Sequence, residues 1–118
     1  MKYAHQLDGQ NMTLTIQGDL IGETKGIELV EIINNVLNAG VRYALVDIAD
    51  VRYINSSGIG VLITILTKFR NKGGEMYLIQ PSEHVKKLLI ITKLQAIFNI
   101  VNSKAEALGQ ISECIWGK

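Results

Sequence analysis

Two adjacent serine hydroxyls, Ser56 and Ser57, are the groups in this chain whose type and position most favour chemistry. They stand at the start of an apolar series with helical spacing, with Asn55 before them and Gly58 and Gly60 after them. A phosphate at a helix start meets unpaired backbone N–H groups and the positive end of the helix dipole. Because glycine removes side chains from that first turn, another protein's active site can approach the hydroxyl. The pattern indicates either a phosphorylation site or an ordinary helix cap.

The elements that position the serines follow from the hydrophobic spacing. Residues 43–48 are a β-branched and aromatic run without Gly or Pro, which predicts a buried strand. A helix is expected from residue 57 to the glycines at 73 and 74. Its predicted core face consists of Ile59, Leu62, Ile63, Leu66 and Phe69. Val61 and Ile65 then fall one turn apart on the outer flank. They form a docking patch there, unless another helix covers them or they are scattered exposed apolar residues of the usual kind.

The rest of the chain alternates between strand and helix patterns. Strands at 3–7 and 12–17 flank an Asp-Gly turn, which favours a hairpin. There follow a helix at 23–39, a strand at 75–79, a helix from Pro81-Ser82 to residue 91, a strand near 98–101 and a helix from 104. The first of these helices has a predicted core stripe of Ile27, Val30, Ile33, Val36 and Leu37. The order predicts one α/β domain over residues 1–118, a mixed sheet of about five strands with helices packed mainly on one face.

Composition narrows the class of protein. A formal net charge of +1 over 118 residues predicts no broad electrostatic attraction to nucleic acid or to an anionic membrane. The single cysteine, Cys114, cannot form an internal disulfide. No segment reaches the roughly 20 apolar residues that span a bilayer, and the first residues lack the apolar run of a signal peptide. We therefore expect a cytoplasmic protein without membrane insertion.

Other kinds of chemistry have weaker support. His5 and His84 lie far apart and show no metal-ligand spacing. The serines lack the Gly-x-Ser-x-Gly elbow of a hydrolase, and there is no Walker loop or dinucleotide fingerprint. Asp19, Asp47 and Asp50 could gather near the serine loop, or could serve as turn and cap residues. Neither a metal nor a cofactor is expected, and the chain is expected not to be an enzyme.

The segment Asn55-Ser56-Ser57-Gly58-Ile59-Gly60 resembles the phosphorylation loop of the STAS family, the anti-sigma factor antagonist domains, which usually reads Asp-Ser-Ser/Thr-Gly-Leu/Ile-Gly. Gly18-Asp19-Leu20 resembles the family's glycine turn after the second strand. Further similar segments lie at 46–54, 73–78, 85–89 and 97–108. The chain departs from the family at three positions. Asn55 and Ile21 replace acidic residues, and Lys93 stands where Gly is common.

This resemblance implies a stand-alone anti-sigma factor antagonist that works as a binding switch. By the resemblance, the unphosphorylated form binds an anti-sigma factor serine kinase of the GHKL type, which uses ATP to phosphorylate Ser56. A PP2C-like phosphatase reverses the modification. Partner contacts are expected at Gly58, Val61, Ile65 and Asp19.

The remaining loop residues, Asn55, Ser57 and Gly60, are expected to support the loop, with Ser57 as a capping or supporting hydroxyl. The alternatives are a constitutive STAS adaptor, and a ligand-sensing or transport-associated STAS module without phosphorylation. The residues leave open the identity of the kinase, the phosphatase and the sigma factor.

Overall fold

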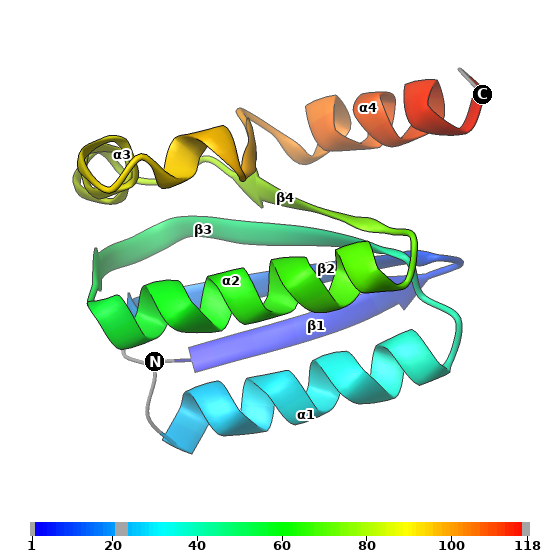
Figure 1. Ribbon diagram of the computed structural model, residues 1–118, viewed down its shortest axis with the longest axis horizontal. Helices are drawn as coiled ribbons and strands as arrows, with labels where there is room; N and C mark the ends of the chain where they lie inside the picture. Colours follow the sequence, from blue (N-terminus) through cyan, green and yellow to red (C-terminus); the bar gives the residue numbers. More distant parts are fainter. Residues whose placement is uncertain (1, 21–23, 117–118) are drawn as a thin grey trace.

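The computed structural model describes the backbone of residues 2–20 and 24–116 and the side chains of residues 2–19 and 26–111 (Figure 1). Ile21, one of the departures from the family pattern, lies outside these residues. In chain order the elements are β1 Lys2–Asp8, β2 Asn11–Leu20, α1 Thr24–Asn38, β3 Tyr43–Ile54, α2 Ser56–Asn71, β4 Glu75–Ile79, α3 Glu83–Ile91, the short 3-10 helix η1 Leu94–Ala96, β5 Asn99–Val101 and α4 Lys104–Trp116.

The strands form one five-stranded sheet in the order β1-β2-β3-β4-β5. β1 and β2 pair antiparallel through the predicted hairpin, and Gly9 supplies a positive φ of 60° at the turn. The pairs β2–β3, β3–β4 and β4–β5 are parallel. The predicted mixed sheet is therefore confirmed, with its antiparallel member at one edge.

Strand β3 is longer than its sequence pattern predicted. It continues to Ile54, where the apolar run alone indicated an end near residue 48. Beyond Asp47 the strand still pairs with β2, and the register shifts twice, between Thr15 and Gln17 and between Gly18 and Leu20. In this extension Val51 and Ile54 are buried, whereas Asp50, Arg52 and Tyr53 are exposed. Because it continues to Ile54, β3 leads directly into the serine loop.

Most helices pack on one face of the sheet, as predicted: α1, α2 and α3 lie on one face and α4 on the other. The larger buried cluster joins one face of β2, β3 and β4 to side chains of α1, α2 and α3. The smaller cluster lies on the other face beneath α4 (Figure 1) and consists of Leu45, Tyr77, Ile79, Val101, Ala107 and Ile111. Alternation along β3 divides its side chains between the two, with Ala44 and Val46 in the larger cluster and Leu45 in the smaller.

The prediction for the flanks of α2 was wrong. Ile65 is completely buried and Val61 is 9% exposed, whereas Ile63 is only partly buried. α1 packs along α2, so that α2 needs an apolar face toward α1 as well as one toward the sheet. A Cβ added at Gly26 of α1 would lie 2.8 Å from Cγ2 of Val61, which shows how closely the helices approach. The alternative that another helix covers Val61 and Ile65 is the correct one.

The predicted core stripe of α1 is also partly wrong. Ile27 is 66% exposed and Val30 is half-buried, while Leu29, outside the predicted stripe, is completely buried. Ile33, Val36 and Leu37 are buried as expected. The first turn of α1 is thus rotated relative to the prediction, because Gly26 rather than Ile27 faces α2.

A side-chain contact fastens the edge strand β1 to α1. The O–H of Tyr3 donates a hydrogen bond to Oε2 of Glu28 at 3.2 Å. Desolvation, together with the hydrogen bond and the negative charge of Glu28, raises the pKa of the Tyr3 phenol above its ordinary value. The edge strand β1 is therefore held by this hydrogen bond to α1 as well as by its pairing with β2.

Candidate phosphorylation and docking site

The junction of β3 and α2 is fixed by Asn55. Its backbone is extended, with φ −99° and ψ 179°, and its Oδ1 accepts a hydrogen bond of 2.7 Å from the backbone N–H of Gly58. Its carbonyl accepts from the N–H of Ile59 at 2.9 Å. Asn55 is therefore the N-cap, and Ser56 is the first helical residue. The helix therefore begins one residue before residue 57, where the sequence pattern predicted its start.

Both serine side chains are exposed at the start of α2. Within the described part of the chain, neither hydroxyl makes a hydrogen bond, so the capping role expected for Ser57 belongs to Asn55 instead. The backbone N–H groups of the first helical residues have no intrahelical acceptor. A charged oxygen group attached to Ser56 would meet these donors and the positive end of the helix dipole.

The two glycines of the loop have different surroundings. Gly58 is buried, and its N–H is used by the cap. Gly60 is half-buried, and a Cβ added there would have no heavy atom within 4 Å. The helix surface beside Ser56 is therefore bare at Gly60, as the sequence pattern indicated.

A shallow apolar hollow lies between the N-terminal halves of α1 and α2. It has a volume of about 240 Å³ and is lined by Gly26, Ile27, Val30, Glu31 and Val61. Val61, one helical turn beyond Gly58, thus keeps a small accessible surface within this hollow. Ile65 does not, because it is completely buried. The exposed apolar side chain here is Ile27, which the sequence pattern had assigned to the core.

The three aspartates that could have gathered near the serine loop instead lie apart along β2 and β3. Asp47 accepts a hydrogen bond from the N–H of Ala49 at 3.0 Å, and Asp50 accepts one from Nε2 of Gln17 at 3.4 Å. Among the described residues no group of three His, Cys, Asp or Glu side chains could hold a metal ion. Asp19 is exposed, and its neighbour Leu20 pairs with Ile54, so that Asp19 lies beside the end of β3.

An aromatic pair joins the end of β3 to the first turn of α3. The rings of Tyr53 and His84 are 6.0 Å apart between centroids, and Tyr53 is 47% exposed. α3 is fastened here by Ser82, which caps the helix and whose Oγ donates to the carbonyl of Val51 at 3.0 Å. The sequence placed His84 in a first helical turn but had no signal for its contact with Tyr53, because the contact depends on how α3 packs on β3.

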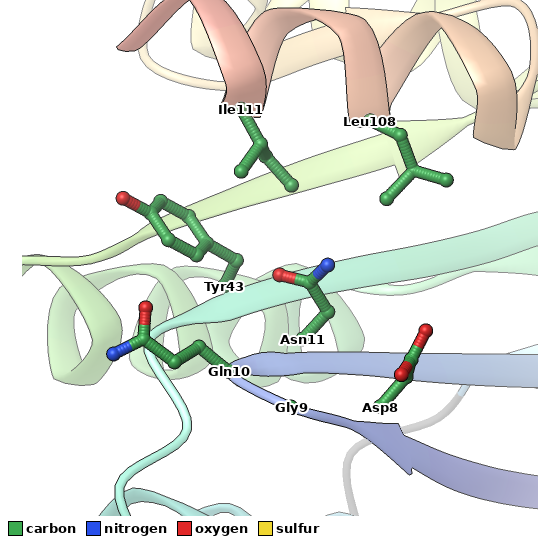
Figure 2. A pocket seen from close by; sticks show the side chains of 7 residues that line it. All are labelled: Asp8, Gly9, Gln10, Asn11, Tyr43, Leu108 and Ile111. Carbon is green, nitrogen blue, oxygen red and sulfur yellow. The ribbon is translucent and has the colours of Figure 1, made fainter. Parts of the chain in front are cut away.

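A second hollow lies at the opposite end of β3 (Figure 2). It has a volume of about 360 Å³ between the β1–β2 turn and α4. Figure 2 shows Leu108 and Ile111 of α4 pointing toward the turn, opposite Asp8 and Asn11. Tyr43, the first residue of β3, lines this hollow, whereas Ser56 follows the last residue of β3 by two positions. The hollow is therefore separated from Ser56 by the length of the strand.

Comparison with known proteins identifies the family. The family model described as "STAS domain" matches residues 3–107. A protein of Thermotoga neapolitana named as an anti-sigma factor antagonist homologue is 34% identical over 80 residues, which cover 68% of this chain and 71% of that protein. A protein of Thermotoga maritima, also named as an anti-sigma factor antagonist, is 30% identical over the same shares. The chain belongs to the STAS family of anti-sigma factor antagonists.

Solved structures agree with this fold. A crystal structure of an anti-sigma factor antagonist from Thermotoga maritima has a TM-score of 0.84 at 23% identity, covering 93% of this chain and 94% of that one. The unphosphorylated form of SpoIIAA has a TM-score of 0.72 at 15% identity, covering 94% and 98%. In the part of this chain that the structure describes, no helix is both long and apolar enough to cross a membrane.

Proposed function

We propose that this chain is a phosphorylation-controlled antagonist of an anti-sigma factor in the cytoplasm. The unphosphorylated form binds an anti-sigma factor serine kinase, the kinase uses ATP to phosphorylate Ser56, and a PP2C-like phosphatase restores the binding form. The observation that carries the proposal is the exposed Ser56 hydroxyl at the first position of α2, in a chain whose relatives are named as anti-sigma factor antagonists. An apolar hollow lined in part by Val61 lies along the same helix.

The docking surface proposed for the kinase contains Ser56 and Ser57, the bare helix surface at Gly60, and the α1–α2 hollow. Ile27 supplies its exposed apolar anchor and Val61 part of its floor. Tyr53 and Asp19 border the same junction on its other sides. Aromatic and apolar anchors surrounded by polar groups are typical of protein interfaces. Gly58 and Ile65 were also expected as partner contacts, but both are buried and are left out of this surface.

Phosphorylation is expected to act on the interface and to leave the fold intact. The added charge of about −1.5 to −2 would lie at a helix N-terminus, where it is tolerated. In a closed interface, however, the phosphate must be desolvated and must displace partner atoms that pack near Gly60. Changing the partner from mostly bound to mostly free requires a loss of roughly 3 to 5 kcal/mol of binding free energy.

The experiment that tests the proposal is intact-mass and site-mapping analysis of the protein from its native cells, before and after PP2C treatment. A removable phosphate on Ser56 is the expected result. Ser57→Ala is the matched control, since the neighbouring hydroxyl is also exposed but lies one position further along the helix. The Ser57→Ala protein is expected to retain the phosphate and the Ser56→Ala protein to lose it. Phosphate that disappears only in Ser57→Ala would contradict the assignment.

Binding supplies the second arm of the test. Ser56→Ala is expected to bind the co-purifying kinase constitutively, and Ser56→Asp is expected to weaken that binding by at least about tenfold. Equal affinity of the two variants would contradict the switch mechanism.

The constitutive adaptor remains the second candidate because Asn55 replaces the acidic residue of the family pattern. Asn55 caps α2 well, so the fold does not need the carboxylate, whereas a kinase that reads the carboxylate does. A single unmodified mass in every growth and stress condition would favour the adaptor.

A further inference from the structure

The last turn of α3 exposes more apolar surface than a solvent-facing helix normally does. Ile90 is 58% exposed and Ile91 is 77% exposed, and they are consecutive. Lys86 and Lys87 precede them by one turn each, so that each isoleucine shares a helix face with a lysine. We call these four residues the α3 patch. Contiguous apolar surface with a charged border is a mark of a binding surface.

The α3 patch also contains a hollow. It has a volume of about 240 Å³ and is lined by Lys86, Ile90, Gln95 and Ile100, from α3, η1 and β5. The patch thus combines the exposed side chain of Ile91 with this apolar hollow, which is lined by the neighbouring Ile90. The serine switch uses neither feature.

A complementary surface lies on α1 of the same chain. Ile27 is 66% exposed, and Glu31 lies one turn further along the same helix face. Both line the hollow of about 240 Å³ between α1 and α2. We call Ile27 and Glu31, with this hollow, the α1 patch. Like the α3 patch, it pairs a projecting isoleucine with a recess, but its charged residue is acidic.

The apolar and charged residues of the two patches can pair with each other when α1 of one molecule and α3 of another run antiparallel. On α1 the isoleucine comes first and the acid four residues later, and on α3 Lys87 comes first and Ile91 four residues later. In antiparallel contact, Ile27 faces Ile91 while Glu31 faces Lys87. The net charge of +1 adds little overall repulsion between two copies.

We propose that the α1 patch of one molecule binds the α3 patch of a second copy of this chain. Ile91 enters the α1–α2 hollow, and Ile27 enters the hollow of the α3 patch. Figure 1 places α1 and α3 on opposite sides of the molecule, so the contact is head-to-tail and leaves a free patch at each end. Because each patch is small compared with a stable dimer interface, the association is weak and depends on concentration.

This inference goes beyond the proposed switch and has a consequence for it. The α1–α2 hollow is part of the surface proposed for the kinase. A second copy seated there would compete with the kinase, so that raising the concentration of free antagonist would reduce the fraction available for binding. Self-association is measured on the unmodified protein alone, and its result is independent of whether Ser56 is phosphorylated.

The test is sedimentation velocity of the full chain from micromolar to submillimolar concentration at low salt. The weight-average sedimentation coefficient is expected to rise with concentration, and Ile91→Glu is expected to weaken the association by at least about tenfold. Leu7→Glu is the matched control, because Leu7 is 51% exposed on β1, outside both patches, and its loss should leave the association unchanged.

Charge exchange tests the pairing directly. Glu31→Lys and Lys87→Glu should each weaken the association, and the double variant Glu31→Lys/Lys87→Glu should restore it, because the ion pair is then rebuilt in reverse. Thermal melts confirm that each variant is folded. A monomer at every concentration would overturn the proposal, and so would an association that survives Ile91→Glu or that the double variant fails to restore.

Discussion

At the scale of single residues, Gly74 has the least room for a side chain among the glycines whose surroundings the structure describes. A Cβ added there would lie 1.7 Å from the carbonyl oxygen of Arg42, which also accepts the N–H of Glu75 at 3.0 Å. Gly74→Ala must therefore separate β4 from the start of β3, and we expect it to lower the free energy of unfolding by about 2 kcal/mol or more. Urea denaturation measures this loss.

Gly109 is the matched control for that substitution. It lies within α4, where an added Cβ would have no heavy atom within 4 Å. Gly109→Ala should raise the free energy of unfolding by up to about 1 kcal/mol, because alanine restricts the unfolded chain and favours the helix. A Gly74→Ala protein as stable as Gly109→Ala would contradict the close approach.

Lys93, which stands where Gly is common in the family pattern, has a left-handed backbone. Its φ is 62° and its N–H donates to the carbonyl of Ile90, so that it closes α3 as Gly73, with φ 81°, closes α2. An L side chain is disfavoured in this conformation. Lys93→Gly should therefore stabilise the protein by up to about 1 kcal/mol in chemical denaturation. Lys72→Gly, at φ −97°, should have the opposite sign, and an equal effect of both substitutions would contradict the argument.

At the scale of elements, the start of α2 depends on one side-chain hydrogen bond. Asn55→Ala removes the acceptor of the Gly58 N–H and should cost about 1 kcal/mol of unfolding free energy. Asn55→Asp should keep the cap and gain from the helix dipole. The helix terminus would hold the pKa of that new carboxyl below its unfolded value, so the gain should be present at neutral pH and lost as the pH falls through the folded pKa. Denaturation at several pH values checks both signs, and a gain that persists in acid would contradict the dipole argument.

Turn, cap and hydrophobic patterns in the sequence predicted where the helices and strands lie. They predicted less well which side chains of each helix face the core. The bounds of β4, the Ser82 cap of α3 and the position of Asn55 followed from turn and cap residues, which act over a few positions. The burial of Ile65 and the exposure of Ile27 did not, because both depend on how α1 packs along α2.

The same distinction applies to the candidate site. The motif indicated the serine loop, but only the packed structure reveals the α1–α2 hollow and the contact between Tyr53 and His84. The extension of β3 to Ile54 was also missed, since its mixed apolar and charged residues are held in the sheet by pairing with β2.

At the scale of the whole molecule, we propose that residues 1–118 form one domain, because the five strands pair in a single sheet.

The two faces of this sheet differ in how many apolar side chains they bury. β3 and β4 contribute to both clusters. Among the side chains of α4 that the structure describes, the buried ones belong to the smaller cluster, and they are Ala107 and Ile111. A helix held by few buried contacts opens at a lower free energy than the core of the sheet.

Hydrogen exchange followed by mass spectrometry should therefore show α4 exchanging before β3 and α2. Ile111→Ala should accelerate exchange in α4 while leaving β3 protected, since Ile111 belongs only to the smaller cluster. Ile33→Ala is the contrasting variant, because Ile33 is completely buried in the larger cluster. It should lower the global free energy of unfolding by about 2 to 5 kcal/mol and accelerate exchange in every element. If Ile111→Ala instead accelerates exchange equally throughout the chain, α4 is part of the cooperative core, and the division between the two faces has no energetic meaning.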